Sequence, residues 1–163
     1  MSDADPVNTA VPGARYAELR SPYAVDLLQE EEPIGSGHTL RDHVTRSDQA
    51  LKNRLETMRF SFGPLQGGYL RDGSFTSLEA ANKLVNSTLH QNAPLVETVA
   101  LGKTRFNVSV ESYFASPTGY EAFKVHLNGQ ANIRDTFGVR VVIRHNGNTS
   151  NGFSVITAFP INR

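Results

Sequence analysis

Two short segments near opposite ends of the sequence carry the side chains that best suit cleavage of a phosphodiester. His43 ends the segment His38-Thr39-Leu40-Arg41-Asp42-His43, Arg54 follows eleven residues later, and Thr157 opens Thr157-Ala158-Phe159-Pro160. A neutral imidazole, with an ordinary pKa of about 6.5, accepts a proton from a hydroxyl. A guanidinium offers a planar fork of donors to phosphate oxygens, and a threonine hydroxyl adds one more donor. If the attacking group is a 2′-hydroxyl, the substrate is RNA and the product a 2′,3′-cyclic phosphate, with no metal needed.

Each of these residues also has a purely structural interpretation. A lone histidine near a helix end is usually structural or solvated, an arginine such as Arg54 is often on the exposed face of a helix, and Thr157 is a good strand former. His38 has the alternative role of capping or ordering the Gly35-Ser36-Gly37 hinge. A metal site built on His38 and His43 is not expected, because paired metal histidines on a helix are four residues apart. His126 is a reserve candidate for a second acid or base.

The elements that carry these residues must bring them together. In one unbroken helix, His43 and Arg54 would lie about 16 Å apart along the axis, too far to hold one phosphate. Ser47 is a favoured N-cap residue, so we expect a break there and two short helices that meet at an angle. On the last strand, alternation predicts that Val155, Thr157 and Phe159 share one face.

Composition and charge narrow the class of protein. The 163 residues suit a single domain and include no cysteine, which excludes disulfides and thiolate metal sites. The net charge of zero hides an asymmetry: residues 1–32 carry seven acidic residues against two arginines, whereas residues 33–163 carry nine against fourteen basic residues. The second part is therefore modestly basic, as a phosphate-binding domain should be. No apolar run approaches the ~20 residues of a membrane span.

The chain divides into a lead and a domain. Residues 1–15 have no apolar period and are interpreted as a linker, and residues 16–32 have some helical spacing that ends at Pro33. We therefore expect an acidic linker or lead segment over residues 1–33 and one domain over residues 34–163. The N-terminus does not have the pattern of a signal peptide, so export would depend on another signal or on a longer protein.

Within the domain, helices come first and strands follow. Short helices are predicted from His38 and from Ser47, and the capping box Thr76-Ser77-Leu78-Glu79 predicts a longer one to about Asn92. After Pro94 the pattern alternates, which predicts strands around residues 106–110, 123–127, 139–143 and 153–159, with a turn at residues 145–148. The sequence therefore predicts an α+β fold, with N-terminal short helices packed on a twisted antiparallel β-sheet.

The order of several short segments resembles a known family. These segments are Gly37-His38-Thr39-Leu40 with His43-Val44, Leu51 with Arg54-Leu55, Ser74-Phe75-Thr76 with Ala80-Ala81, Val141-Val142-Ile143-Arg144, and Thr157-Ala158-Phe159-Pro160. Together they resemble the RNase A-like toxin domain at the C-termini of bacterial contact-dependent growth inhibition proteins and related polymorphic toxins. The resemblance covers roughly residues 35–160.

The resemblance implies both a fold and an activity. It implies an RNase A-like fold without disulfides and a metal-independent endoribonuclease without a cofactor, which is neutralised by a cognate immunity protein. It further implies a domain that is part of, or derived from, a larger delivery protein and that acts as a secreted effector in the target-cell cytoplasm. The expected partners are RNA and the immunity protein, with no membrane.

The resemblance also assigns roles to residues. His43, Arg54 and Thr157 match the catalytic positions, and we expect His38, Arg46 and Phe159 to contact substrate. The family often has a tyrosine where this chain has Phe159, so a hydroxyl is missing there. A slower enzyme, or a replacement donor such as Tyr120, would follow.

Two other functions stay open at this point. One is a catalytically weak or silent RNA- or protein-binding module on the same fold, which the phenylalanine at position 159 would suit. The other is a hydrolase that acts on a different phosphate ester.

Overall fold

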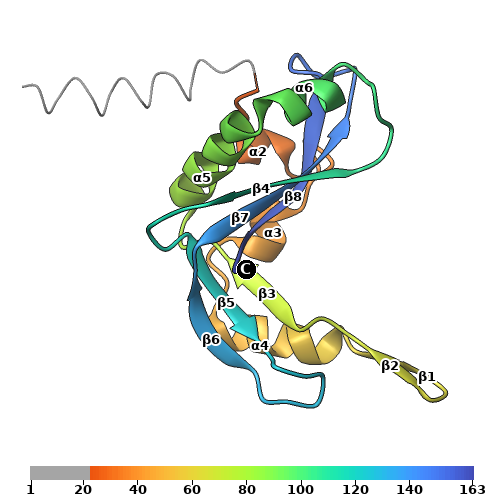
Figure 1. The fold of residues 1–163 in the computed structure, drawn as a ribbon, viewed down its shortest axis with the longest axis vertical. Helices are drawn as coiled ribbons and strands as arrows, with labels where there is room; N and C mark the ends of the chain where they lie inside the picture. Colours follow the sequence, from red (N-terminus) through yellow and green to blue (C-terminus); the bar gives the residue numbers. More distant parts are fainter. Residues whose placement is uncertain (1–22) are drawn as a thin grey trace, which may run out of the picture.

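The computed structural model describes residues 23–163; the predicted linker and the first part of the predicted helix over residues 16–32 lie outside this range. The helices are α2 (Leu27–Glu30), α3 (Thr39–His43), α4 (Asp48–Thr57), α5 (Leu78–Gln91) and α6 (Ala93–Ala100). The strands are β1 (Phe60–Phe62), β2 (Leu65–Gly67), β3 (Arg71–Ser74), β4 (Val108–Tyr113), β5 (Gly119–Phe123), β6 (Asn132–Thr136), β7 (Gly138–His145) and β8 (Phe153–Ile161). Figure 1 shows this arrangement, which confirms the predicted α+β class.

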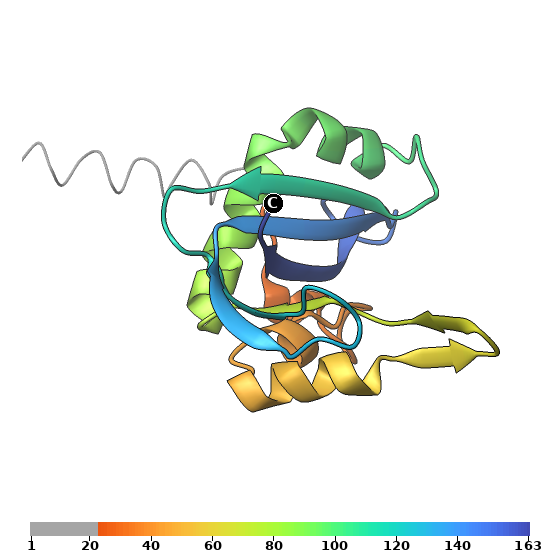
Figure 2. The same cartoon turned by 60° about the horizontal axis from the view of Figure 1, so that its bottom comes forward.

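Within residues 23–163, the strands form two three-stranded sheets and one hairpin. Their orders are β4-β7-β8 and β3-β5-β6, every neighbouring pair is antiparallel, and β1 pairs only with β2. Only Phe137 separates β6 from β7, so one stretch of chain passes from the second sheet into the first. Figures 1 and 2 show the two sheets meeting at an angle, with the β1–β2 hairpin projecting away from both.

Helices α5 and α6 cover the β4-β7-β8 sheet and enclose the larger core. Along α5, Ala81, Val85 and Leu89 recur every four residues and are all buried against that sheet. The predicted capping box is displaced by one residue: the Ser77 hydroxyl, not that of Thr76, accepts the hydrogen bond from the Ala80 amide at 3.0 Å. A serine at this position satisfies one of the free amides of the first turn.

Helix α4 covers the second sheet. Leu51 and Leu55 are buried and form a smaller core with Ala122 of β5. As predicted, Ser47 is the N-cap, and its hydroxyl accepts from the Ala50 amide at 3.1 Å. The residues between α3 and α4 have no helical conformation, so the expected break between His43 and Arg54 is present.

The packed body begins ahead of the predicted boundary at residue 33. Leu27 of α2 is fully buried in the larger core, and the Glu30 carboxylate accepts a hydrogen bond from the Val155 amide of β8 at 2.7 Å. The Glu31 carboxylate accepts from the amides of Leu40 and Arg41 at the start of α3. Residues 27–31 therefore help to position β8 and α3.

Several elements differ from the sequence-based predictions. Pro94 was expected to mark the end of helical structure, but it lies in the first turn of α6, where a missing amide proton costs little. The strand predicted around residues 123–127 lies earlier in the chain. Strand β5 ends at Phe123, and Val125 is exposed. Strands β3 and β6 and the β1–β2 hairpin were not predicted, because they are short and lack a clear alternating pattern. No helix among residues 23–163 has the length and apolarity needed to cross a bilayer.

Candidate active site

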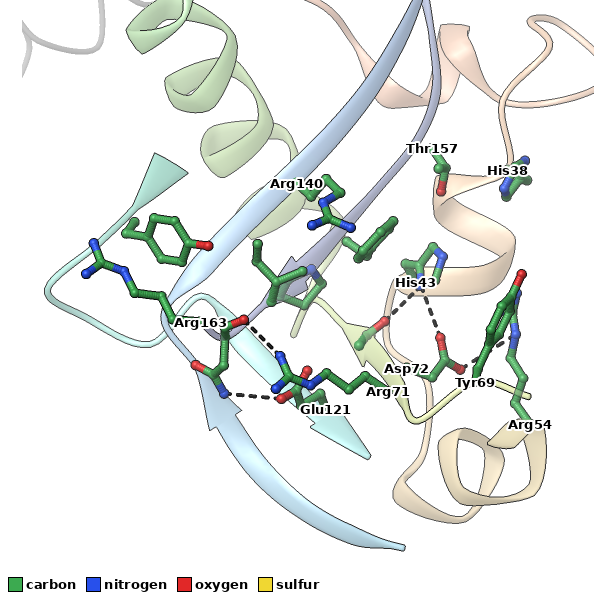
Figure 3. Close-up of a pocket in the computed structure, with 16 residues that line it drawn as sticks. His38, His43, Arg54, Tyr69, Arg71, Asp72, Glu121, Arg140, Thr157 and Arg163 are labelled. Carbon is green, nitrogen blue, oxygen red and sulfur yellow. Dashed lines mark hydrogen bonds and ion pairs between the residues drawn. The ribbon is translucent and has the colours of Figure 1, made fainter. Parts of the chain in front are cut away.

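A pocket of about 630 Å³ receives side chains from both three-stranded sheets and from α3 and α4 (Figure 3). Its walls thus come from segments that are far apart in the sequence. The residues that line it are His38, His43, Arg54, Tyr69, Arg71, Asp72, Gly73, Tyr113, Glu121, Arg140, Thr157, Phe159, Pro160, Ile161, Asn162 and Arg163. Of the six predicted site residues, five line this pocket.

His43 is held at the C-terminal end of α3 against β3. The Phe75 amide donates to the His43 carbonyl at 2.8 Å, and the His43 side chain is only 9% exposed. Its Nδ1 lies 2.9 Å from the Gly73 carbonyl oxygen, which can only accept, so Nδ1 carries the proton of the neutral ring. Nε2 is then the unprotonated nitrogen, with a lone pair available to accept a proton.

The charge state of His43 follows from its surroundings. Burial lowers the pKa of His43 to about 4, and the nearby Arg54 charge acts in the same direction, against the hydrogen bond to Gly73. The ring is consequently neutral at physiological pH, which is the state that a general base requires.

Asp72 connects His43 to Arg54. Its Oδ1 lies 3.6 Å from His43 Nδ1 and its Oδ2 lies 3.6 Å from Arg54 Nε, as Figure 3 shows. Burial raises the pKa of Asp72 to about 6, although the positive charge of Arg54 opposes that shift. Asp72 is not evident from the sequence, because the glycines around residues 63–68 indicate a loop region and an isolated aspartate gives no signal.

Arg54 lies between two carboxylates. Besides the Asp72 contact, its Nη2 is 3.4 Å from Asp42 Oδ2, and its side chain is 27% exposed. Burial alone would raise the pKa of Asp42, but the hydrogen bond from Arg41 and the charge of Arg54 together hold that pKa below its usual value. A guanidinium has five N–H donors, so donors of Arg54 remain for a bound phosphate.

The last strand reaches the pocket through a β-bulge. In the pairing of β7 with β8, Val142 faces Thr157 but Ile143 faces Val155, so Ile156 has no partner in the register. The prediction that Val155, Thr157 and Phe159 share one face of the strand is therefore wrong for Val155. Val155 is buried in the core, whereas Thr157 and Phe159 line the pocket. An extra residue of this kind re-aims the side chains that follow it.

Helix α3 is hydrogen-bonded to β8 at this bulge. The His38 amide donates to the Ile156 carbonyl at 3.0 Å, and the Ala158 amide donates to the Thr39 hydroxyl at 2.9 Å. A side chain at Gly37 would come within 2.6 Å of the Val155 carbonyl oxygen, so only glycine permits this close approach. These contacts fix Thr157 relative to the helix that carries His38 and His43.

The β8 side chains face the imidazole. The Phe159 ring packs against His43 with centroids 5.1 Å apart, and the Thr157 hydroxyl is buried without a hydrogen-bond partner. In Figure 3 the oxygen of Thr157 points toward His43. A buried hydroxyl without a partner is energetically costly in a structural role, which favours an interaction that forms with a ligand.

Three residues that the sequence offered as site candidates do not line the pocket. Arg46 is not among the lining residues; its amide donates to the Ser74 hydroxyl and its carbonyl accepts from the Tyr120 hydroxyl. Tyr120, the suggested replacement for the missing tyrosine, is therefore occupied elsewhere. His126 lies after β5 and is exposed, also outside the pocket.

The rest of the pocket was not predicted. Three further arginines line it, of which Arg140 is paired with Glu111 at 2.6 Å, and two exposed tyrosines, Tyr69 and Tyr113, line it as well. Arginines and exposed aromatic rings are the side chains that contact phosphates and unstacked bases of RNA. Among residues 23–163, no group of three or more histidine, cysteine or acidic side chains has a metal-binding arrangement.

Comparisons with known proteins agree with this architecture. A family model described as the bacterial CdiA-CT RNAse A domain matches residues 37–160. Among solved structures, the CdiA-CT/CdiI complex from Y. kristensenii contains a similar chain, with a TM-score of 0.62 and 19% identity over 76% of this chain and 98% of the other. Among curated proteins no match is found.

Proposed function

Since the chain belongs to the family of bacterial CdiA-CT RNase A domains, we propose that it is a metal-independent endoribonuclease toxin. It cleaves RNA by attack of a 2′-hydroxyl on the adjacent phosphorus and leaves a 2′,3′-cyclic phosphate. The observation that carries the proposal is one pocket in which a buried neutral imidazole, a guanidinium and an unpartnered hydroxyl meet.

His43 acts as the general base. Its Nδ1 proton is bonded to the Gly73 carbonyl, so Nε2 takes the proton of the 2′-hydroxyl as the oxygen attacks phosphorus. The Asp72 carboxyl beside Nδ1 is placed to stabilise the imidazolium that forms. General base catalysis of this kind contributes typically ~10²–10⁴-fold in rate.

Arg54 and Thr157 stabilise the phosphorane. Arg54 is aligned by Asp42 and Asp72, and its remaining donors face the non-bridging oxygens, where negative charge accumulates. The Thr157 hydroxyl supplies a further donor from β8. Phe159 packs against the His43 ring and lines the pocket, and His38 lines it from the start of α3.

The same pocket is suited to bind a protein inhibitor. The similar solved chain is part of a CdiA-CT/CdiI complex. Four arginines line the pocket here, so a cognate immunity protein that presents carboxylates in place of phosphates would be electrostatically complementary to it. We propose that such a protein neutralises the domain, which is delivered by a larger protein and acts in the cytoplasm of the target cell.

A weak or silent binding module is the second candidate. Phe159 favours it, because this ring has no hydroxyl to donate to the scissile phosphate. Loss of one such donor typically costs ~10²-fold in rate or more. RNA binding without cleavage would support this second candidate.

The test is cleavage of total RNA in excess EDTA by the purified domain. We expect fragments that end in a 2′,3′-cyclic phosphate, and a loss of ~10²-fold or more for His43→Ala and for Arg54→Ala. His126→Ala is the matched control, because this histidine is exposed outside the pocket. Activity that disappears with EDTA, or that survives in His43→Ala, would contradict the proposed mechanism.

A further inference from the structure

The pocket contains a second imidazole, that of His38, which does not cap the helix at whose start it lies. His38 occupies the N-cap position of α3, but its ring makes no capping hydrogen bond. The amides at the start of α3 are instead satisfied by the Glu31 carboxylate, at 3.0 Å to Leu40 and 2.8 Å to Arg41. The His38 side chain therefore does not cap α3, which was one of the structural alternatives for this residue, and it lines the pocket.

The position of His38 is nevertheless well fixed. Its amide donates to the Ile156 carbonyl at the β8 bulge, one residue before Thr157. Figure 3 shows His38, Thr157 and His43 grouped at the same end of the pocket. A positive charge on His38 also lowers the pKa of His43, so the two rings are close enough to interact electrostatically.

Cleavage needs a proton donor as well as a base, because an alkoxide is a poor leaving group. The arginines of the pocket do not release protons at physiological pH, and tyrosine hydroxyls ordinarily do so only near pH 10. Asp72 is buried, with one carboxyl oxygen beside His43 and the other beside Arg54. An imidazole is the side chain that ordinarily exchanges protons near neutrality, and His38 is the half-buried one at the pocket wall.

We propose that His38, in its protonated form, is the general acid that protonates the departing 5′-oxygen. The inference rests on the proposed ribonuclease function and extends it. As the 2′-oxygen bonds to phosphorus, its proton passes to His43 Nε2. As the bond from phosphorus to the 5′-oxygen breaks, that oxygen takes a proton from the His38 imidazolium. One proton is gained by the enzyme and one is lost, and exchange with water restores both rings.

The distinguishing experiment compares two substrates that share the attacking nucleoside but differ in leaving group. One is a dinucleoside phosphate, whose 5′-alkoxide needs a proton. The other is the 4-nitrophenyl ester of the same nucleoside 3′-phosphate, whose phenolate leaves without one. For His38→Ala we expect kcat/KM to fall ~10²-fold or more on the dinucleotide and less than about threefold on the aryl ester. His43→Ala should lose both activities, because the base is needed for either substrate.

Further variants separate an acid from a structural role. His38→Gln keeps a polar side chain that cannot donate a proton at this pH, so it should show the same selective loss as His38→Ala. Each variant must unfold cooperatively at the wild-type urea midpoint, and His126→Ala should leave both rates unchanged. An equal loss on both substrates, an intact dinucleotide rate in His38→Ala, or a selective loss in Asp72→Asn instead would overturn the assignment. If wild type cleaves neither substrate, the proposed function itself fails.

Discussion

At the scale of single residues, the site is governed by two buried titratable groups whose pKa values move in opposite directions. Burial disfavours the charged form of each, so it lowers the pKa of His43 to about 4 and raises that of Asp72 to about 6. The 3.6 Å separation between them is longer than a hydrogen bond, and the Nδ1 proton is already directed to the Gly73 carbonyl. Both groups are therefore mostly neutral near pH 5, whereas at pH 7 the His43 ring is neutral and the Asp72 carboxyl is mostly ionised.

These shifts predict opposing effects of pH on stability. Between pH 4 and 6.5 the unfolded chain protonates His43 while the folded protein does not, so this residue makes stability fall as pH decreases. Between pH 3.8 and 6 the folded protein holds a proton on Asp72 that the unfolded chain releases, so this residue makes stability rise as pH decreases. In wild type, the two contributions largely cancel over the shared range.

Single variants should expose each contribution. Relative to wild type, the free energy of unfolding of Asp72→Asn should increase as pH rises from 4 to 6, whereas that of His43→Gln should decrease. Urea denaturation at three pH values in this range measures both slopes. Parallel slopes in wild type and both variants would show that burial does not control these groups.

At the scale of elements, the site depends on how α3 is attached to β8. The Thr39 hydroxyl accepts from the Ala158 amide, the His38 amide donates to the Ile156 carbonyl, and both bonds flank the bulge that turns Thr157 into the pocket. The helix that supplies the base is thus bonded directly to the strand that supplies the hydroxyl.

Thr39→Val tests this attachment. Valine keeps the shape of the side chain but leaves the buried Ala158 amide without an acceptor, which should cost ~1–3 kcal/mol in unfolding free energy. RNA cleavage should also slow, because Thr157 is no longer held against α3. Thr76→Val is the matched control, since Thr76 is exposed and the helix cap is Ser77. A stable Thr39→Val protein with wild-type activity would contradict this role.

The elements differ in how well local sequence patterns predict them. The amphipathic spacing of α4 and α5 and the alternation in β7 are local patterns, and these elements lie where they were predicted. The bulge at Ile156 depends on the pairing of β8 with β7 and on the hydrogen bond from α3. The local sequence around Ile156 therefore does not predict it. Asp72 could not be predicted for the same reason. Its role depends on the packing of β3 against α3 and α4, which brings its carboxyl group close to His43 and Arg54.

At the scale of the whole molecule, the pocket exists because two sheets meet closely. Gly73 of β3 lies against Pro160 of β8, and a side chain at Gly73 would come within 2.4 Å of the Pro160 carbonyl oxygen. A side chain at Gly119 of β5 would come within 3.0 Å of the Pro160 side chain. Glycine at these positions lets the sheet that carries Asp72 approach the strand that carries Thr157.

Gly73→Ala should therefore damage both the fold and the site. The added methyl group must push β3 away from β8, which we expect to cost ~1–3 kcal/mol and to displace the carbonyl that orients His43. Gly147→Ala is the control, because its nearest neighbour would be 3.7 Å away. Thermal unfolding and RNA cleavage of the two variants measure the difference; equal behaviour would mean that the sheets can separate without consequence.

The central claim is that the pocket directs a 2′-hydroxyl at phosphorus with His43 as the base. The most direct measurement uses DNA oligonucleotides with a single ribonucleotide, one for each base, incubated with the protein in EDTA. We predict one cut, immediately 3′ of the ribose, that leaves a 2′,3′-cyclic phosphate and is absent with a 2′-O-methyl group or with His43→Ala. Cleavage of the all-DNA strand, or of the 2′-O-methyl strand, would contradict the claim.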